Sequence, residues 1–307
     1  MIEWIPFDRL VNIQKIEKSL YSATWLDGIR KIDGDDYNYM RKREPSCIVA
    51  LKALYGSEEN PLSIKEFDNY INCSLGGIKL RVYGLTQNPE TKEYIMVYQY
   101  FNNGSLNKFL TTNFRIITWQ AKLKILFEIS DDLSKIHKAG YIHSNLTSNK
   151  ILLDQNTSTS LQSSISGLRL SKKNGENNSG SVYGIMPYIA PEVFLGQGST
   201  QAADIYSFGV IMSEMTTGRR PFGDYQYNID LSMKIVNGLR PDFAPGTPSC
   251  YIELAKQCME SDPQNRPSAL DINRKLEGWN KSMEGFDNAG EDEIRKQFLD
   301  ADKIVKT

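Results

Sequence analysis

A long amphipathic pattern that begins at Trp119 limits most strongly what this chain can fold into. From there, apolar residues recur at spacings of three and four, the period of one helical face, at Leu123, Leu126, Ile129, Leu133 and Ile136. Gly140 can end this helix. Three short β-rich segments precede it, at 47–54, 80–84 and 94–98. The sequence therefore predicts strands in the first hundred residues and a long helix after them.

Composition limits the classes of function. The 307 residues, 40% of them hydrophobic, can bury a large core in one domain or two lobes. A formal net charge of −1 argues against nucleic acid or an anionic membrane as a partner held by bulk electrostatics. The start of the chain does not read as a secretory signal, and no apolar run reaches the ~18 residues of a membrane span. We therefore expect a cytoplasmic protein with neither nucleic-acid nor membrane partners.

The cysteines and histidines offer little to a metal ion. The four cysteines form no C-x-x-C pair, and only two histidines are present. Buried, reduced thiols are expected in place of a disulfide framework or a zinc site. The cysteines are Cys47, Cys73, Cys250 and Cys258. No metal-binding residues are predicted.

Residues 137–152, HKAGYIHSNLTSNKIL, carry the most specific pattern. They resemble the catalytic loop of eukaryotic protein kinases, H-R-D-x-x-x-x-N, whose Asp accepts the substrate proton and whose Asn binds a metal ion. His143 keeps the His of this motif. Ser144, Asn145 and Lys150 stand at its Arg, Asp and Asn positions. The resemblance implies a kinase fold whose reactive groups have been replaced, a pseudokinase.

Further motifs follow in the order of the same family. Residues 49–52 read VALK for V-A-I-K, 189–192 read IAPE for A-P-E, and 204–209 read DIYSFG for D-x-W-S-x-G. Residues 258–267 resemble its C-W-x-x-D-P-x-x-R-P segment. The matches extend over roughly 10–277 and most resemble the tyrosine-kinase-like group of Ser/Thr kinases.

The resemblance implies an α+β, bilobal protein-kinase-like fold. A small N-terminal lobe with a β-sheet and one helix is expected at 1–100, and a larger, mainly helical lobe at 101–280. The remainder, 281–307, is expected to be a charged tail. Apolar residues between Glu291 and Lys306 have helical spacing. That helix could pack on the larger lobe or bind a partner.

The resemblance also assigns residues to a nucleotide site. Lys52 would face the phosphates, although a lysine on an edge strand could instead point to solvent. Ala50 would cover the adenine, Tyr98 would be the gatekeeper, and Phe101 would lie in the hinge. Leu152 would form the floor below the adenine. Each of these apolar positions could equally belong to the ordinary core.

Two parts of the family's phosphate site are missing from the sequence. No glycine lies between Ile16 and Trp25, where the family has G-x-G-x-x-G, so side chains hinder the approach of phosphates to backbone N–H groups. Gly167 stands where the Asp of D-F-G would bind Mg²⁺. If ATP binds, we expect it without Mg²⁺, with Lys52 and Lys150 near the phosphates. The alternative for Lys150 is a solvated surface charge.

Residues 62–75 should form the helix of the small lobe. The family pattern places Tyr70 where a Glu would pair with Lys52. Glu66 lies one turn earlier on the same helical face. It could reach Lys52 only if the helix slid by about 5.4 Å. Tyr70 is therefore expected at the partner position, with Glu66 facing solvent.

Several polar stretches are predicted to be loops. Residues 33–43 and 155–164 are rich in turn-forming residues, which indicates connections between strands. Residues 169–183 match the activation loop, with a flexible surface loop as the alternative. Its candidate phosphorylation sites are Ser179, Ser181 and Tyr183.

Two structural contacts are also implied by the resemblance. Glu192 and Arg266 should form a buried ion pair. Asp204 should hold the backbone of the catalytic loop. These groups stabilise the fold and take no part in phosphate transfer. The sequence therefore keeps the family's structural residues and replaces its catalytic ones.

Two functions remain in view. A signalling scaffold or allosteric regulator of a protein partner, such as an active kinase, needs the fold but no phosphate transfer. The alternative is a weakly active or atypical ATP-dependent Ser/Thr kinase. Replacing the catalytic base by Asn145 should lower the rate by ~10²–10⁴, so we expect the scaffold. Nucleotide turnover that falls in Lys52→Ala would favour the enzyme.

Overall fold

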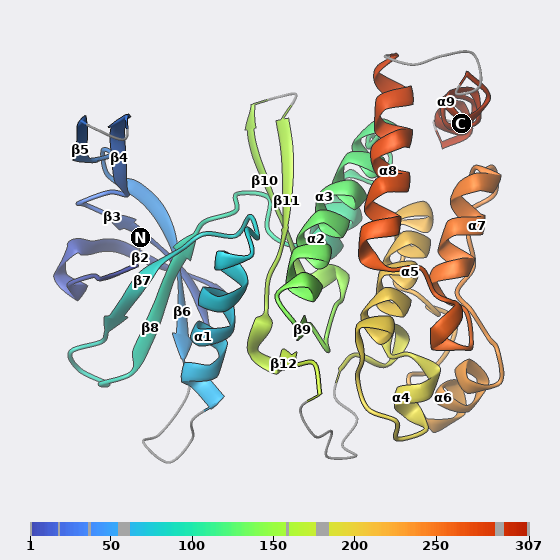
Figure 1. Ribbon diagram of the computed structural model, residues 1–307, viewed down its shortest axis with the longest axis horizontal. Helices are drawn as coiled ribbons and strands as arrows, with labels where there is room; N and C mark the ends of the chain where they lie inside the picture. The colour runs from blue at the N-terminus through green and yellow to red at the C-terminus, as the bar shows by residue number, and fades with distance from the viewer. Residues whose placement is uncertain are drawn as a thin grey trace. The chain divides into compact units, whose positions relative to one another are not determined.

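The N-terminal part is built on a six-stranded sheet in the computed structural model (Figure 1). The strands lie in the order β1-β7-β8-β6-β3-β2, and all neighbours are antiparallel except β1 and β7. The strand bounds in this part, with the separate β4-β5 hairpin, are β1 Glu3–Trp4, β2 Leu10–Glu17, β3 Leu20–Trp25, β4 Arg30–Asp35, β5 Asn38–Arg43, β6 Cys47–Leu54, β7 Val82–Gln87 and β8 Tyr94–Gln99. The structure describes residues 2–17, 19–35, 38–54, 62–157, 160–175, 184–285 and 292–305.

One face of this sheet carries the apolar core of the N-terminal part. Val49 and Leu51, two residues apart in β6, are buried with Trp25 of β3 in one cluster. Successive side chains of a strand point to opposite faces. Ala50 and Lys52 therefore lie on the other face, so the alternation separates the core from the positions assigned to the nucleotide.

The predicted helix of the small lobe is α1, Leu62–Leu75, with the expected bounds. Its buried residues recur at i, i+3, i+4 and i+7, which is one helical stripe. They are Glu66, Asn69, Tyr70 and Cys73. The sheet with a single helix confirms the predicted fold of the N-terminal part.

The structure corrects the prediction of a loop at 33–43. These residues lie mostly in β4 and β5, which pair with each other in an antiparallel hairpin. The polar composition misled the prediction because a strand ladder is made of backbone hydrogen bonds, which any residue but proline can complete. The turn signal at Gly34 and Asp35 falls at the end of β4.

The chain divides into two compact units, residues 1–75 with 79–102 and residues 76–78 with 103–307. The helices of the second unit are α2 Leu106–Asn113, α3 Trp119–Lys138, α4 Pro191–Phe194, α5 Gln201–Thr217, α6 Ile229–Val236, α7 Ser249–Cys258, α8 Ala269–Glu284 and α9 Asp292–Val305. Its strands are β9 Tyr141–Ile142, β10 Ile151–Thr157, β11 Ser160–Ile165 and β12 Lys172–Lys173. The second unit is thus mainly helical, as predicted.

The prediction of a turn at 155–164 is also wrong, because most of these residues belong to the β10-β11 hairpin. Two of its serines turn inward toward carboxylates of α3. Ser163 donates its backbone N–H and its hydroxyl to Glu128 Oε2, at 2.5 and 2.9 Å. Ser164 donates its hydroxyl to Asp132 Oδ2 at 2.7 Å. The prediction treated serines as solvent-facing and could not foresee these partners.

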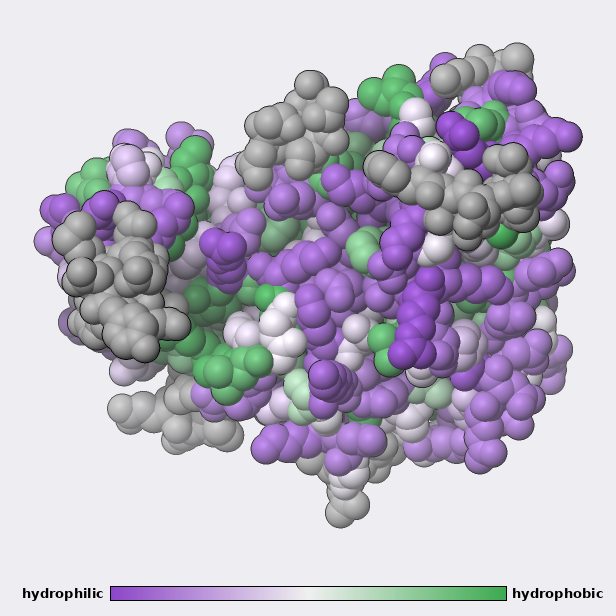
Figure 2. All heavy atoms as spheres, turned by 45° about the horizontal axis from the view of Figure 1, so that its top comes forward, coloured by the Kyte–Doolittle hydropathy of each residue, from purple (hydrophilic) through white to green (hydrophobic). Residues whose placement is uncertain are grey.

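Helices α3 and α5 form the centre of the second unit. The apolar residues that predicted α3 are all fully buried, and Thr118 caps its start by accepting a hydrogen bond from Ala121 N at 3.2 Å. Helix α5 ends at Gly218, as predicted. A Cβ on Gly209 would lie 2.7 Å from Met259 Cγ, so α7 can approach α5 only because residue 209 is glycine. Hydrophilic side chains cover most of this unit in the view of Figure 2.

The C-terminal helix α9 packs on the second unit, one of the two alternatives predicted for the tail. Phe298 is fully buried, with its ring centroid 5.4 Å from that of Trp119 and 5.5 Å from that of Trp279. Asp302 Oδ1 accepts a hydrogen bond from Trp119 N at 2.9 Å. Helix α9 therefore closes one end of the core around α3. Among the described residues, no helix combines the length and apolar character needed to cross a membrane.

Candidate functional site

Lys52 is paired with a carboxylate on α1. Its Nζ lies 2.6 Å from Glu66 Oε1, and the Glu66 side chain is only 3% exposed. The prediction that Tyr70 takes the partner position is wrong by one helical turn, and α1 need not slide. Motif spacing does not determine which residue of α1 faces Lys52, because the connection before the helix can vary in length. The buried carboxylate fixes it here, because such a group requires a cation.

Two other predicted nucleotide contacts, Ala50 and Tyr98, share a sheet face with Lys52. Ala50 lies opposite Tyr98 of β8 in the strand register and opposite Ser22 of β3 on its other side. Ala50, Tyr98 and Phe101 are all buried. Burial raises the pKa of the Tyr98 phenol, with the charge of a nearby carboxylate acting in the same direction. The structure groups Ala50, Tyr98 and Lys52, and their contact with a nucleotide stays a prediction.

Asp204 holds the backbone of the loop that resembles the catalytic loop. Its Oδ2 accepts a hydrogen bond from His143 N at 2.7 Å, and its Oδ1 accepts one from Ser144 N at 2.9 Å. His137 Nε2 lies 2.9 Å from the same Oδ2. Ser144 has φ +65°, which residues other than glycine seldom adopt. The predicted structural role of Asp204 is confirmed.

His143 is fully buried beneath this loop. Its Nδ1 accepts a hydrogen bond from Asn145 N at 3.2 Å, and its Nε2 lies 3.1 Å from the carbonyl oxygen of Ser166. These partners place the ring proton on Nε2. Burial lowers the pKa of His143, and the charge of Lys150 acts in the same direction. The neutral ring therefore positions the loop.

Lys150 lies across the glycine at the D-F-G position. A Cβ added to Gly167 would stand 2.7 Å from Lys150 Cδ and 3.4 Å from its Nζ. The lysine chain thus occupies the space that a side chain at position 167 would need. Leu152, two residues after Lys150, is half-buried in β10 and forms a β-bridge with Ser105.

The residues at the family's metal positions do not suit Mg²⁺. This ion prefers oxygen ligands, carboxylates above all. Gly167 offers no side chain, Lys150 offers an ammonium and Asn145 offers an amide. In the part of the chain that the structure describes, no group of three or more His, Cys, Asp or Glu could hold a metal ion. Asn145 also lacks a carboxylate that could accept the substrate proton.

The predicted ion pair between Glu192 and Arg266 is confirmed. Both guanidinium nitrogens Nη1 and Nη2 donate to the carboxylate at 2.7 Å, and both side chains are buried. The guanidinium also stacks over the ring of Tyr206, 5.3 Å from its centroid. This bidentate pair joins α4 to the segment before α8.

Sequence reasoning missed Glu214, a buried carboxylate within α5. Its Oε2 accepts a hydrogen bond from the Tyr188 hydroxyl at 2.6 Å. Its Oε1 accepts from Ser148 Oγ at 2.9 Å and from Asn107 Nδ2 at 3.0 Å. Burial raises the pKa of Glu214. The sequence could have indicated Glu214, because a carboxylate within an apolar helix must find hydrogen-bond partners when it is buried.

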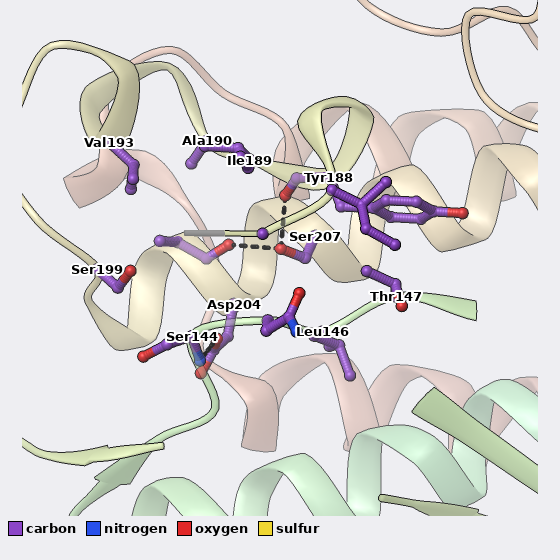
Figure 3. A pocket seen from close by; sticks show the side chains of 14 residues that line it. Ser144, Leu146, Thr147, Tyr188, Ile189, Ala190, Val193, Ser199, Asp204 and Ser207 are labelled. Atoms are coloured by element: carbon purple, nitrogen blue, oxygen red, sulfur yellow. Dashed lines mark hydrogen bonds between the residues drawn. The ribbon is translucent and has the colours of Figure 1, made fainter. Parts of the chain in front are cut away.

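A small pocket lies between the loop and α5 (Figure 3). In Figure 3, Ser144, Leu146 and Thr147 lie on one side and Tyr188 to Ala190 on the other. Three side-chain oxygens of its lining are buried and have no hydrogen-bond partner within the described residues. They are Ser144 Oγ, Asn145 Oδ1 and Thr147 Oγ1. Native proteins leave few such groups unpaired, so this pocket is a second candidate site.

The predicted phosphorylation sites Ser179, Ser181 and Tyr183 lie outside the described residues. The first described residues after them are Gly184 and Ile185, which are exposed at the pocket.

Comparison with known proteins is consistent with this architecture. A family described as "Protein tyrosine and serine/threonine kinase" matches residues 34–276, more than half of the chain. "Probable serine/threonine-protein kinase roco5" of Dictyostelium discoideum is 32% identical over 193 residues, 59% of this chain and 7% of that protein. "Dual specificity protein kinase splA" of the same organism is 28% identical over 194 residues, 58% of this chain and 8% of that protein.

A "Probable LIM domain-containing serine/threonine-protein kinase" of Dictyostelium discoideum is 27% identical over 243 residues, 76% of this chain and 36% of that protein. The chain thus spans only 7% to 36% of the length of these relatives. The family match includes β6 with Lys52, the loop at 143–150 and the Glu192–Arg266 pair. With this match and this sheet-and-helix architecture, the chain belongs to the protein tyrosine and serine/threonine kinase family.

Proposed function

We propose that this kinase domain is a pseudokinase, which binds ATP without Mg²⁺ and acts by binding a protein partner. The single observation that carries the proposal is the position of Lys150 against Gly167. Its Nζ would stand 3.4 Å from a Cβ at the position where the family has its metal-binding Asp. A cation therefore takes the place of a metal ligand.

The charges of two lysines support nucleotide binding without a metal. In the family, Mg²⁺ neutralises part of the phosphate charge and a lysine of the V-A-I-K strand meets the phosphates. By their places in the family motifs, Lys52 would supply that lysine and Lys150 would add a second ammonium. An ammonium is a compact point charge that suits phosphate oxygens. The two lysines would replace part of the electrostatic role of the metal ion.

The replacement of groups that phosphate transfer needs supports a loss of catalysis. Asn145 cannot accept the substrate proton, and a missing general base lowers rates by ~10²–10⁴. The absence of glycine between Ile16 and Trp25 removes the close backbone cover over the phosphates. The retained Glu192–Arg266 pair and the loop held by Asp204 keep the shape of the domain. A protein partner, such as an active kinase, would bind to the surface of the domain so formed.

Thermal unfolding with ATP, in Mg²⁺ and in EDTA, tests the proposal. A ligand at about 100 times its Kd stabilises the folded state by about 2.7 kcal/mol. We expect equal stabilisation in both buffers, and its loss in Lys52→Ala and in Lys150→Ala. Lys138→Ala, which removes an exposed lysine near the end of α3, is the matched control and should keep it. Stabilisation that requires Mg²⁺, or none in either buffer, would contradict the proposal.

The Lys52–Glu66 pair favours a second candidate, a weakly active Ser/Thr kinase. Active protein kinases need this lysine–glutamate pair to be formed, and the 2.6 Å contact shows it formed here. Transfer of labelled phosphate from ATP to protein would support this candidate if Lys52→Ala abolishes it. Transfer that is unchanged in Lys52→Ala would come from a contaminant and would leave the pseudokinase as the function.

A further inference from the structure

One row of side chains crosses four strands of the sheet in the first unit. Residues that stand directly opposite each other in paired antiparallel strands share a face. Glu17 of β2 pairs with Leu20 of β3, and Leu20 pairs with Lys52 of β6. Lys52 pairs in turn with Met96 of β8. The lysine assigned to the phosphates is therefore flanked by two apolar side chains, with a carboxylate one strand further along the row.

The described charges on this face do not favour a chain of phosphates. Lys52 Nζ is paired with Glu66 Oε1 at 2.6 Å, so the two groups together carry no net charge. The Lys52 side chain is 25% exposed and stays accessible to a ligand. Burial raises the pKa of the Tyr98 phenol, and the charges of Glu66 and Glu17 raise it further. Glu17 therefore acts on the face that carries Tyr98 and Lys52, and it adds a negative charge there.

Lys15, the other charged residue of β2, faces away from this row. It pairs with Tyr21, and Tyr21 pairs with Leu51. Leu51 belongs to the apolar core on the opposite face of the sheet. The carboxylate of Glu17 is therefore not neutralised by a lysine of its own strand.

The β2-β3 hairpin is tied to β6 close to this row. The carbonyl oxygen of Ser19 accepts a hydrogen bond from Ala53 N at 3.2 Å. Only two residues, Ser19 and Lys18, separate Glu17 from Leu20 in the sequence, and Lys18 lies outside the described residues. In the family this hairpin covers the phosphates. The side chains that the hairpin holds on this face would therefore meet them.

We propose that Glu17 and Leu20 make this site select adenine nucleotides with few phosphates, so that AMP binds more tightly than ATP. Lys52 offers one ammonium to the single phosphate of AMP. Each further phosphate adds negative charge, which Glu17 repels, and Leu20 offers it no hydrogen bond. The family has glycines in this hairpin, which present neither a charge nor a side chain. The inference rests on the proposed function, which requires a nucleotide at Lys52, and it names the class of nucleotide.

Titration calorimetry of the full chain with AMP, ADP and ATP in EDTA tests the order of affinity. We expect AMP to bind about tenfold more tightly than ATP, a difference of about 1.4 kcal/mol, with ADP between them. The preference should shrink as salt rises from about 0.01 M to about 0.15 M, because the Debye length falls from about 30 Å to about 8 Å. Equal affinities, or tighter binding of ATP than of AMP, would overturn the proposal.

Variants of the two residues separate charge from size. Glu17→Gln keeps the size of the side chain and should tighten ATP about threefold while leaving AMP unchanged. Leu20→Ala removes most of the side chain and should also tighten ATP relative to AMP. The ratio of the two affinities is measured within one protein, so a change in stability cancels.

Two further variants are matched controls. Glu90→Gln removes an exposed carboxylate between β7 and β8, and Leu26→Ala shortens a 41% exposed leucine beyond the other end of β3. Neither residue belongs to the row, so both variants should keep the preference of the wild type. A preference for AMP that persists unchanged in both Glu17→Gln and Leu20→Ala would refute the roles of these residues.

Thermal unfolding with ATP in Mg²⁺ and in EDTA separates this inference from the proposed function. Stabilisation by ATP in EDTA, with AMP binding no more tightly than ATP, would refute the selectivity and leave the pseudokinase. A preference for AMP that depends on Glu17, together with an ATP effect that requires Mg²⁺, would support the selectivity and refute metal-free binding of ATP. No binding of any of the three nucleotides would refute both.

Discussion

Lys150 and Gly167 are structurally coupled: Lys150 Cδ lies 2.7 Å from the place that a Cβ on residue 167 would take. Real Cβ atoms do not approach another carbon so closely. A side chain at residue 167 therefore requires the Lys150 chain to move, so the effects of changing these two residues should not be additive.

Gly167→Asp tests this coupling. Alone, it should lower the free energy of unfolding by about 1–3 kcal/mol, mainly through the strain of φ +86°, because the flexible end of the Lys150 chain can move aside at small cost. Combined with Lys150→Asn, which removes that chain end, it should recover up to about 1 kcal/mol. Urea denaturation of the wild type, both single variants and the double variant measures this. Strictly additive effects would show that the two residues do not contact each other.

The Lys52–Glu66 pair predicts a different pattern. Lys52→Met should lower the free energy of unfolding by about 3 kcal/mol, because it leaves the buried carboxylate of Glu66 without its cation. Lys52→Met with Glu66→Met should recover most of that loss. Lys31→Met removes the exposed partner of Glu44 and should cost less than about 1 kcal/mol. If Lys52→Met and Lys31→Met cost the same, Glu66 is not the buried partner.

Arg266→Lys should be costly even though it keeps the charge. An ammonium cannot make the two parallel hydrogen bonds that Arg266 makes to Glu192, so we expect a loss of about 2–4 kcal/mol in chemical denaturation. Arg274→Lys is the matched control. Its partner Asp271 is 3.8 Å away and both side chains are exposed, so its cost should fall within about 0.5 kcal/mol of zero. Equal costs would mean that the bidentate geometry does not matter.

Lys122 should give the folded protein a distinctive dependence on pH. It is buried with Nζ 4.7 and 4.9 Å from the ring centroids of Phe114 and Trp119, and burial lowers its pKa from 10.5 to about 8. Between these values the unfolded chain binds more protons than the folded protein, so the free energy of unfolding rises with pH.

The comparison with Lys122→Met isolates this effect. From pH 7 to pH 10.5 the wild type should gain up to about 3 kcal/mol relative to the variant, as its destabilising buried charge is lost. Urea denaturation at these two pH values measures the gain. Other titrating groups are common to both proteins and cancel. The same pH dependence in both would show that Lys122 keeps its ordinary pKa.

Phe298→Ala should destabilise the whole second unit. It empties the space between Trp119 and Trp279, and losing a buried phenylalanine typically costs about 3–5 kcal/mol. The neighbouring Leu299 is 42% exposed, so Leu299→Ala should cost less than about 1 kcal/mol. The emission of tryptophan during denaturation reports both. Equal small effects would mean that α9 is detached from the unit in solution.

Spacing alone predicted the parts of the fold that have a strong period. The α3 pattern and the β6 segment lie where the sequence placed them, because burial imposes a period on apolar residues. The A-P-E to R-P scaffold was predicted from the family resemblance and not from spacing. The hairpins at 33–43 and 155–164 were missed because their ladders use backbone atoms, and the inward serines of β11 are held by carboxylates from distant sequence.

The residues of the candidate nucleotide site were named from the sequence, and their contact with a nucleotide stays a prediction. Asn145, Lys150 and Gly167 were recognised from the motif, yet no sequence rule places Lys150 across Gly167. The partner of Lys52 was missed by one turn of α1. Glu214 and the unpartnered oxygens at the pocket went unseen, because their significance depends on what surrounds them after folding.

The family match ends at residue 276, inside α8, whereas the core it belongs to ends on α9. Cutting the chain at the limit of homology would remove Trp279 and Phe298 together and leave Trp119 facing water at the first residue of α3. The last residue of the family match and the last element of the packed core therefore do not coincide. In this domain, residues beyond the family match complete the layer around its central helix.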